Sequence, residues 1–371
     1  MKPQFELCIE IGEIPILVRT DSAEFASLLR DRYGKFVVGW RAAGDPTSEA
    51  PGRGGKQAMQ HEAESGCGPP SAACLVSNFQ FPVPAFELDV ELFPPGLMSD
   101  AEEARVRLEG GRWVMERGDF RAECDPVRRR GWVRQSANPY SIDAVLRMLH
   151  SLILARDGGF LVHAASAVRN GRAFLFAGVS GAGKTTISRL APPDVVLLTD
   201  EISYVRGFRI QESGVRNQES EVRGTDFGLQ IPDSESRTPS PESRTPDPDP
   251  RIRDQESEIQ NRHVLNRQST IDNRQSYEAF GTPFAGELAR VGENLRAPLA
   301  ALYLLAQGPE NRVEPMSDAE AARELLQNIL FFARDEELVG MIFQTVCDFV
   351  RRVPVHRLVF TPDARVWELI T

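Results

Sequence analysis

The sequence predicts an α/β protein in which a β-rich N-terminal domain, residues 1–135, precedes a larger α/β domain, residues 136–371. Three observations support this fold class. Strand-like alternation dominates the first part of the chain, a hairpin is followed by a glycine-rich turn and a short helix in the middle, and two stretches poor in apolar residues interrupt the pattern. We expect a flexible insertion at 42–73, rich in Gly, Pro, Ser and Ala, and a long disordered insertion at 209–277.

The N-terminal domain is predicted from period-two patterns. Residues Phe5–Ile11 alternate apolar and polar side chains, as expected of a half-buried strand. Similar patterns occur at Phe86–Phe93, Ala104–Leu108 and Arg112–Glu116, and Gly110-Gly111 favours a hairpin turn between the last two. No pattern in this domain indicates a catalytic or binding site.

A helix is predicted at the start of the second domain, where apolar residues recur every three or four positions after Ser141, the expected N-cap. Two strands follow it, Phe160–Val168 and Arg172–Gly178. Asn170-Gly171 lies between them and favours a type I′ turn, so the two strands should form a hairpin.

The elements after this hairpin follow from local signals. A short helix, Lys184–Leu190, should end before Pro192-Pro193, and the apolar run Val195–Leu198 should form a buried strand. Beyond the second insertion we expect a strand at Leu299–Leu305, a helix from its cap Ser317 to about Arg334, a helix at about Glu336–Arg351, a strand at Val355–Phe360 and a short helix after Thr361-Pro362.

The second insertion has a distinct composition. Residues 209–277 contain too few apolar side chains to offset the entropy of ordering the segment. Short repeats occur in it: Gln-Glu-Ser begins at Gln211, Gln218 and Gln255, and Glu-Ser-Arg-Thr-Pro occurs twice. We interpret the segment as an expanded surface loop, since long loops add little closure entropy.

Composition excludes several functional classes. The net charge of −10 argues against a nucleic-acid-binding protein. The longest apolar run, Ala297–Ala306, is far shorter than the ~20 residues that span a bilayer, so no membrane association is expected. The five cysteines are scattered and odd in number, which argues against a zinc site or a disulfide framework. The N-terminus lacks a secretory pattern, and we expect a cytoplasmic protein.

The glycine-rich turn matches the phosphate-loop pattern G-x-x-x-x-G-K-[ST] completely. Glycines allow its backbone N–H groups to face inward and bind phosphate oxygens, together with the following helix N-terminus. The lysine should reach the β- and γ-phosphates of a nucleotide, and the threonine hydroxyl can bind Mg²⁺. The expected nucleotide-binding residues are Gly178, Val179, Ser180, Gly181, Ala182, Gly183, Lys184, Thr185 and Thr186.

An acidic pair, Asp200-Glu201, follows the apolar strand Val195–Leu198. The carboxyl ends of strands in an open α/β sheet face the ligand crevice. One of the two carboxylates could therefore hold Mg²⁺, and the other could accept a proton from an attacking hydroxyl. The alternative is a solvated strand end or a helix cap.

Two classes of phosphate-loop protein are excluded by missing motifs. The chain has no Asn-Lys-x-Asp, which a translational-type GTPase should carry, and no Leu-Ser-Gly-Gly-Gln, which a transporter ATPase should carry. The middle of the chain resembles the core of bacterial HPr kinase/phosphorylase. The resemblance rests on His163, on GVSGAGKTT from Gly178 and on LLTDE ending at Glu201. This resemblance covers about Phe160–Val205 well and Ala279–Thr371 in outline. It implies a P-loop kinase core of the HPr kinase/phosphoenolpyruvate carboxykinase type, which uses ATP and Mg²⁺.

The resemblance also implies residue roles. Lys184 would bind the phosphates, Thr185 would bind Mg²⁺, and Asp200 would be the catalytic base. Glu201 stands where the family has a second, metal-binding aspartate. His163 would lie near the active-site phosphate, or would simply pack against the sheet as a strand histidine.

A second candidate segment is Gly281–Glu287 (GTPFAGE), which looks like one found in HPr-kinase-like proteins of unknown substrate. Thr282, Glu287 or Arg290 could touch a substrate. Arg290 and Arg296 could supply positive charge to a transferring phosphate, and the favoured alternative is that they are solvated surface arginines. An ordinary turn into a strand is the alternative interpretation of the segment.

The expected function is an ATP-dependent kinase that phosphorylates an unidentified protein or small-molecule hydroxyl. Two alternatives remain open: a non-catalytic nucleotide-binding module that regulates or matures a partner, and carboxykinase chemistry on a small carboxylic acid. The sequence leaves the oligomeric state open, and a homo-oligomer is compatible with it.

Overall fold

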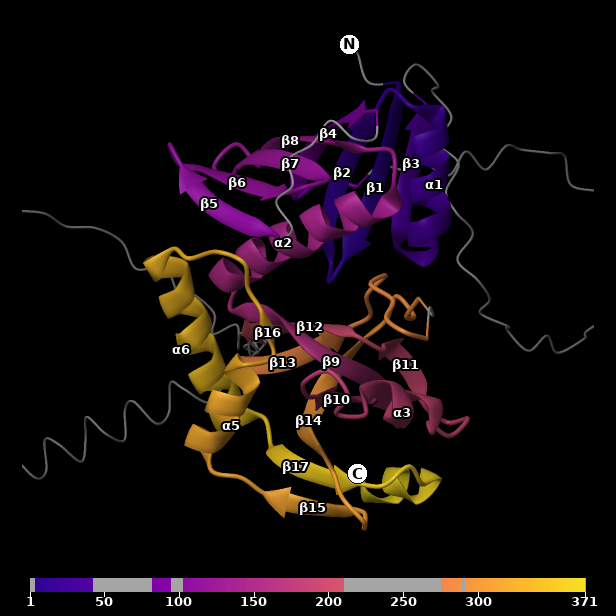
Figure 1. Ribbon diagram of the computed structural model, residues 1–371, viewed down its shortest axis with the longest axis vertical. Helices are drawn as coiled ribbons and strands as arrows, with labels where there is room; N and C mark the ends of the chain where they lie inside the picture. The colour runs from indigo at the N-terminus through magenta and orange to yellow at the C-terminus, as the bar shows by residue number, and fades with distance from the viewer. Residues whose placement is uncertain (1–3, 43–81, 95–102, 210–274, 289–290, 371) are drawn as a thin grey trace, which may run out of the picture. The chain divides into compact units, whose positions relative to one another are not determined.

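The computed structural model describes residues 4–42, 82–94, 103–209, 275–288 and 291–370 (Figure 1). It is a mixed α/β protein with large sheets and few helices. The insertions predicted at 42–73 and 209–277 lie outside the described residues, except at their ends, where Ala42, Arg209 and residues 275–277 belong to strands and the predicted boundaries are wrong. No helix in the described ranges is long and apolar enough to cross a membrane.

The first sheet is built from the N-terminal part of the chain, and its eight strands within the described residues have the order β3-β1-β2-β4-β8-β7-β6-β5. These strands are β1 (Phe5–Ile11), β2 (Ile14–Thr20), β3 (Val37–Ala42), β4 (Phe86–Phe93), β5 (Arg105–Glu109), β6 (Arg112–Arg117), β7 (Phe120–Asp125) and β8 (Arg130–Ser136). The predicted turn at Gly110-Gly111 is confirmed, since both glycines have positive φ between β5 and β6.

The second sheet follows it in sequence, and the structure describes nine strands in it. Seven form the path β10-β9-β12-β13-β14-β17-β15, while β11 and β16 also pair with β9. The strands are β9 (Gly159–Arg169), β10 (Arg172–Ala177), β11 (Val196–Thr199), β12 (Ile202–Arg209), β13 (Gln275–Phe280), β14 (Arg296–Gln307), β15 (Arg312–Pro315), β16 (Ile329–Leu330) and β17 (Val355–Phe360).

Strand β9 has different neighbours along its length. Its first half pairs with β12 and β16, and its second half pairs with β10 and β11. The predicted hairpin between β9 and β10 is confirmed, with Asn170 and Gly171 both at positive φ. The register brings Ala177, the last residue of β10, opposite Ala164, while Ile202 lies opposite His163.

Three strands of this sheet are parallel. Strand β10 pairs with β14, and β14 pairs with β17, in the same direction. Their carboxyl ends, at Ala177, Gln307 and Phe360, therefore meet at one edge of the sheet. In open α/β sheets this edge is where ligands bind.

The helices differ from the sequence expectation at their ends. Helix α2 (Pro139–Asp157) is capped by Asn138 and not by Ser141, whose hydroxyl instead donates to Asp119 at 2.6 Å. Helix α5 (Asp318–Leu326) is capped by Ser317 as predicted, but it ends well before Arg334 because the chain then forms β16 and pairs with β9.

The remaining helical segments agree with the sequence prediction in part. Helix α6 (Glu336–Arg352) matches its prediction, and α3 (Lys184–Arg189) follows the glycine-rich turn. The last helical segment, η2 (Ala364–Leu369), is capped by Asp363 and not by Thr361. Helix α1 (Ala23–Tyr33), within a region predicted as strands, and the single turn η1 (Gly34–Phe36) were not predicted.

Helix α2 lies between the two sheets in Figure 1, and its buried side chains join them into one hydrophobic cluster. A second cluster surrounds α3 and η2 against β10, β14 and β17. The described residues of both sheets belong to one compact unit. The division into domains 1–135 and 136–371 therefore stays a prediction.

Candidate nucleotide and phosphoryl-transfer site

The glycine-rich turn connects β10 to α3 and curls tightly. Gly181 and Gly183 have φ values of +81° and +111°, which L-residues with a side chain rarely adopt. A Cβ at Gly178 would lie 2.7 Å from the Cβ of Ala182, and Ala182 N–H donates to the carbonyl of Val179 at 3.1 Å. The glycines of the motif are thus required by the shape of the loop.

The loop is fixed at the ends of the parallel strands. Gln307, at the end of β14, donates from Nε2 to the carbonyl of Gly181 at 2.8 Å. Phe360, at the end of β17, packs so closely that a Cβ at Gly183 would lie 2.5 Å from its ring. Val179, Ser180 and Gly181 are exposed, so the tip of the loop is accessible.

Lys184 lies at the first position of α3, and only 7% of the residue is exposed. Its Nζ donates to the carbonyls of Gly178 at 2.7 Å and Val179 at 3.2 Å, so the ammonium group lies inside the curl of the loop. Burial lowers the pKa of Lys184, and the carboxylates of Glu201 and Glu287 oppose that shift. The Lys184 ammonium therefore lies where the motif predicts that it contacts phosphate oxygens.

Thr185 and Thr186 occupy the first turn of α3 and are partly buried. The Thr185 hydroxyl donates to Glu287 Oε2 at 3.2 Å. Glu287 belongs to the predicted second segment, Gly281–Glu287, so two motifs that are 102 residues apart in the chain meet here.

Asp200 follows β11 and is 4% exposed. Both of its oxygens accept backbone hydrogen bonds of 2.9 Å, from Gly286 N–H and from Leu288 N–H. A Cβ at Gly286 would lie 2.8 Å from the Cβ of Glu201, so this glycine lets the backbone approach the acidic pair. Asp200 thus holds the backbone of residues 286–288 at the end of β11 through these two hydrogen bonds.

Thr282 does not face a ligand site. It is fully buried, its N–H donates to Leu198 O at 3.2 Å, and its hydroxyl donates to Ile202 O at 2.9 Å. The expectation that Thr282 contacts a substrate is wrong for this arrangement, because both of its polar groups tie the segment to the sheet.

Glu201 is partly buried, and its carboxylate has no hydrogen-bond partner among the described residues. Burial raises its pKa, with Asp200 and Glu287 adding to the increase while Arg147 and Lys184 oppose it. The carboxylates of Asp200, Glu201 and Glu287 therefore interact with two cations beside the loop, the Lys184 ammonium and the Arg147 guanidinium.

Arg147 of α2 is the site residue that sequence reasoning missed. Its guanidinium lies over the ring of Phe284 at 4.9 Å, and its Nε is buried without a hydrogen-bond acceptor in the described ranges. The available signal was a lone arginine in the apolar middle of a helix. Arg296, proposed for this charge, instead pairs with Glu13 at 2.7 Å, and Arg290 lies outside the described residues.

His163 lies in β9 beside the loop, opposite Ile202, and its N–H donates to Asn328 O at 2.7 Å. Burial lowers the pKa of His163, and the charge of Lys184 lowers it further. The histidine is a strand residue, and its closeness to an active-site phosphate stays a prediction.

Comparisons with protein-family models and with curated proteins find no match for this chain. Within the described residues, no group of three or more His, Cys, Asp and Glu side chains is arranged to hold a metal ion.

Proposed function

We propose that this chain is a cytoplasmic ATP-dependent kinase that transfers the γ-phosphoryl group to a hydroxyl of a protein or small molecule. The observation that carries this proposal is the ammonium of Lys184, held by Gly178 and Val179 inside a loop with the complete phosphate-binding sequence. The resemblance of Phe160–Val205 to HPr kinase/phosphorylase supports the same reaction class, with a P-loop kinase core of that type.

Nucleotide binding is assigned to residues 178–186. The backbone N–H groups of the curled loop would donate to phosphate oxygens, as in other glycine-rich phosphate loops. The Lys184 ammonium would exchange its two carbonyl acceptors for oxygens of the β- and γ-phosphates, which are stronger acceptors because they are charged.

The oxygen ligands that Mg²⁺ prefers are present beside the loop. Thr185 Oγ1 and Glu287 Oε2 lie 3.2 Å apart, close to the spacing of two neighbouring ligands of one octahedral ion, and Glu201 offers a third oxygen donor. Mg²⁺ takes most of its ligands from phosphates and water, so a protein cage is not required. Bound there, the ion would neutralise charge on the β- and γ-phosphates.

The acidic pair, Asp200-Glu201, is assigned to accept the proton of the acceptor hydroxyl. Asp200 is the base implied by the family resemblance, and each of its oxygens keeps one lone pair beyond its backbone hydrogen bond. His163 would contact the transferring group, and the lowering of its pKa by the charge of Lys184 supports a place near the loop. Lys184 and Arg147 supply the positive charge that the transferring phosphoryl group needs.

Calorimetry with MgATP tests the nucleotide site. Lys184→Met should lower the affinity for MgATP at least about tenfold and abolish ADP formation, because it removes the charge inside the loop. Arg189→Met is the matched control, since Arg189 is an exposed cation on the same helix. Equal affinities of wild type and Lys184→Met would refute the proposal.

A non-catalytic nucleotide-binding module is the second candidate, and one observation favours it. Both oxygens of Asp200 already accept backbone hydrogen bonds, as expected of a carboxylate with a structural role. Incubation of the protein with MgATP and candidate acceptors separates the two: binding without any ADP formation supports the module, and acceptor-dependent ADP formation supports the kinase.

A further inference from the structure

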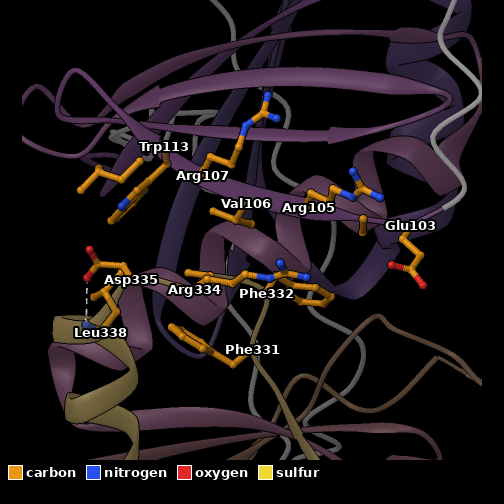
Figure 2. A pocket seen from close by; sticks show the side chains of 13 residues that line it. Glu103, Arg105, Val106, Arg107, Trp113, Phe331, Phe332, Arg334, Asp335 and Leu338 are labelled. Carbon is orange, nitrogen blue, oxygen red and sulfur yellow. Dashed lines mark hydrogen bonds between the residues drawn. The ribbon is translucent and has the colours of Figure 1, made fainter.

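Helix α6 (Glu336–Arg352) has one buried and one exposed face. Helices α2 and α5 and strand β9 lie against its buried face. Leu338, on that face, lines a cavity of about 750 Å³ between β5 and the start of α6. Asp335 caps the helix by accepting from Leu338 N–H at 3.0 Å, a hydrogen bond that Figure 2 shows beside the cavity. The start of the helix is therefore fixed, with its buried face directed towards the rest of the chain.

The opposite face of α6 carries a stripe of exposed and partly exposed residues. Its members follow one another three or four positions apart and so lie along one side of the helix: Glu336, Gly340, Phe343, Cys347 and Arg351. We call these five residues the α6 stripe. Phe343 is 55% exposed, and Val339, beside it, is 46% exposed. Both side chains keep apolar surface in water, and a partner that covered it would gain the free energy of that burial.

Gly340 lies within the α6 stripe, although glycine is less favourable in a helix than any residue except proline. A Cβ at Gly340 would meet nothing within 4 Å, so the packing of the described chain does not require the missing side chain. At such a position the backbone of a second helix can approach closely. The glycine therefore fits a contact with another helix better than it fits a free surface.

The α6 stripe is complementary to itself when two copies run in opposite directions. A two-fold axis between Phe343 and Gln344 sets Glu336 opposite Arg351 of the second copy, and Gly340 opposite Cys347 of the second copy. Unlike charges then meet at each end, and two small residues face each other on either side of the axis. A parallel pair would instead set Glu336 against Glu336 and Arg351 against Arg351, which repel.

The charges at both ends of the stripe are available for such a contact. Glu336 is exposed and forms no ion pair within the part of the chain that the structure describes. Arg351 has 67% of its side chain exposed, and its contact with Asp348 is long, at 3.8 Å. Asp348 also accepts from Gln344 Nε2 at 3.1 Å, so it keeps a partner when Arg351 turns to another carboxylate. The first turn of α6 is acidic and its last turn is basic, so neighbouring side chains do not reverse these signs.

We propose that two copies of this chain associate through their α6 stripes, antiparallel and related by a two-fold axis between Phe343 and Gln344. The partner is a second copy of the same chain because the stripe matches its own reversed order in charge and in side-chain size. One helix pair buries less surface than a standard protein interface, so the dimer should be weak and reversible. All residues of the contact lie on α6, so the dimer does not require the proposed nucleotide site.

Sedimentation velocity of the full chain without nucleotide tests for this dimer. The share of dimer should rise with concentration between about 1 and 200 µM. Phe343→Glu should weaken association at least about tenfold, because it places two carboxylates near the axis. Val127→Glu, at a valine exposed in the turn between β7 and β8, should associate like wild type. A wild-type chain that stays monomeric throughout this range, or a Phe343→Glu variant that dimerises equally well, overturns the proposal.

Exchange of the end charges tests the antiparallel direction. Glu336→Arg sets two cations opposite each other, and Arg351→Glu sets two carboxylates opposite each other, so each change should weaken the dimer. The double variant restores unlike pairs and should dimerise like wild type. Thermal melting of all three variants checks that they are folded. A double variant that dimerises as weakly as the single ones rules out the antiparallel pair.

A cross-link tests the register. Gly340→Cys places a thiol opposite Cys347 of the second copy, within the range that a disulfide spans when two helices are in close contact. Diamide should give a covalent dimer in which peptide mass mapping finds position 340 joined to Cys347, and adding Cys347→Ser should remove this link. Oxidation that never joins these two positions contradicts the proposed register. Lys184→Met should dimerise like wild type, so loss of the nucleotide site and loss of the dimer are distinguished.

Discussion

Gly183 has the least room for a side chain in the glycine-rich turn, and a comparison with Gly181 shows the reason. Both have positive φ, but only at Gly183 would a Cβ meet the ring of Phe360, at 2.5 Å, while Gly181 has open space. Gly181→Ala should lower the free energy of unfolding by about 1–2 kcal/mol, the cost of a left-handed conformation for alanine. Gly183→Ala should cost more and also weaken MgATP binding, because the loop must move away from β17.

Urea unfolding and calorimetry measure these two effects. Equal losses in the two variants would contradict the assignment of the clash to Phe360, since the φ of +111° at Gly183 is at least as unfavourable for alanine as the φ of +81° at Gly181.

The acidic pair gives a second residue-scale prediction, which separates the structural from the chemical role of Asp200. In Asp200→Asn the new NH₂ group would face Gly286 N–H or Leu288 N–H, donor against donor. We expect a lower thermal midpoint and loss of phosphoryl transfer. Glu201→Gln leaves those hydrogen bonds intact and should keep the thermal midpoint of wild type.

Parallel measurements of melting and of ADP formation distinguish the possibilities. If Asp200→Asn melts like wild type, the two backbone hydrogen bonds do not hold the second segment. If Glu201→Gln retains full transfer and magnesium dependence, Glu201 has no part in the proposed chemistry.

The residues of the candidate site were predictable to different degrees. The loop residues 178–185 carry a motif whose spacing reflects backbone geometry, so the sequence locates them. Arg147 carries no motif, because its place beside Phe284 depends on how α2 packs on the second sheet. The same holds for the contact between Thr185 and Glu287, which only the folded chain brings together.

At the scale of elements, α1 and α2 are joined by a buried charged cluster. Asp143 of α2 accepts hydrogen bonds from Arg32 and from the hydroxyl of Tyr33, both at the end of α1. Burial and the neighbouring carboxylate raise the pKa of Tyr33, so its hydroxyl remains a donor. Asp143→Ala leaves both donors without this acceptor and should lower the free energy of unfolding by about 3 kcal/mol.

Urea unfolding of Asp143→Ala checks this value. Arg128→Ala is the control, since it breaks an ion pair with Asp125 that is exposed on the arginine side and should have a much smaller effect. Similar losses in the two variants would show that the cluster does not stabilise the α1–α2 contact.

Elements with strong local signals were predicted well, and the others were not. The hairpins at Gly110-Gly111 and Asn170-Gly171 follow from turn residues that accept positive φ. Helix α1 was missed although Ser22 caps it and its buried residues Phe25, Leu29 and Tyr33 recur every four positions, because the helix is short and lies between stretches with strand-like patterns. The end of α5 was misplaced because pairing of β16 with β9 overrides the helical pattern beyond Leu326.

At the scale of the whole molecule, buried His150 predicts acid sensitivity. Burial lowers its pKa from 6.5 to about 3 in the folded protein. Between these two values the unfolded chain binds a proton that the folded protein does not, so stability falls as the pH falls from 6.5 towards 3. One such proton gives a slope of about 1.4 kcal/mol per pH unit well below pH 6.5, and none above it.

His150→Gln removes this proton and keeps a polar partner for the hydroxyl of Tyr204. Urea unfolding between pH 7.5 and 4.5 should therefore show a flatter decline for the variant, while the lowered pKa of His163 acts in the same direction in both proteins. Parallel stability curves for the two proteins would rule out His150 as the source of the slope.

The second insertion leaves and re-enters the sheet at adjacent strands. Strand β12 is antiparallel to β9 and β13 is antiparallel to β14, so the parallel pairing of β10 with β14 makes β12 and β13 run in opposite directions. Arg209 and Gln275 therefore lie at the same end of neighbouring strands. Replacing residues 210–274 by a turn of about four residues, within the usual hairpin range, should preserve the thermal midpoint and MgATP affinity.

Thermal melting and calorimetry of the shortened chain test this, and aggregation or loss of nucleotide binding would contradict it. The adjacency of β12 and β13 has a consequence for how such a chain changes over generations. A change in the number of the short repeats would lengthen or shorten the chain between β12 and β13, and neither the glycine-rich turn nor the acidic pair would shift.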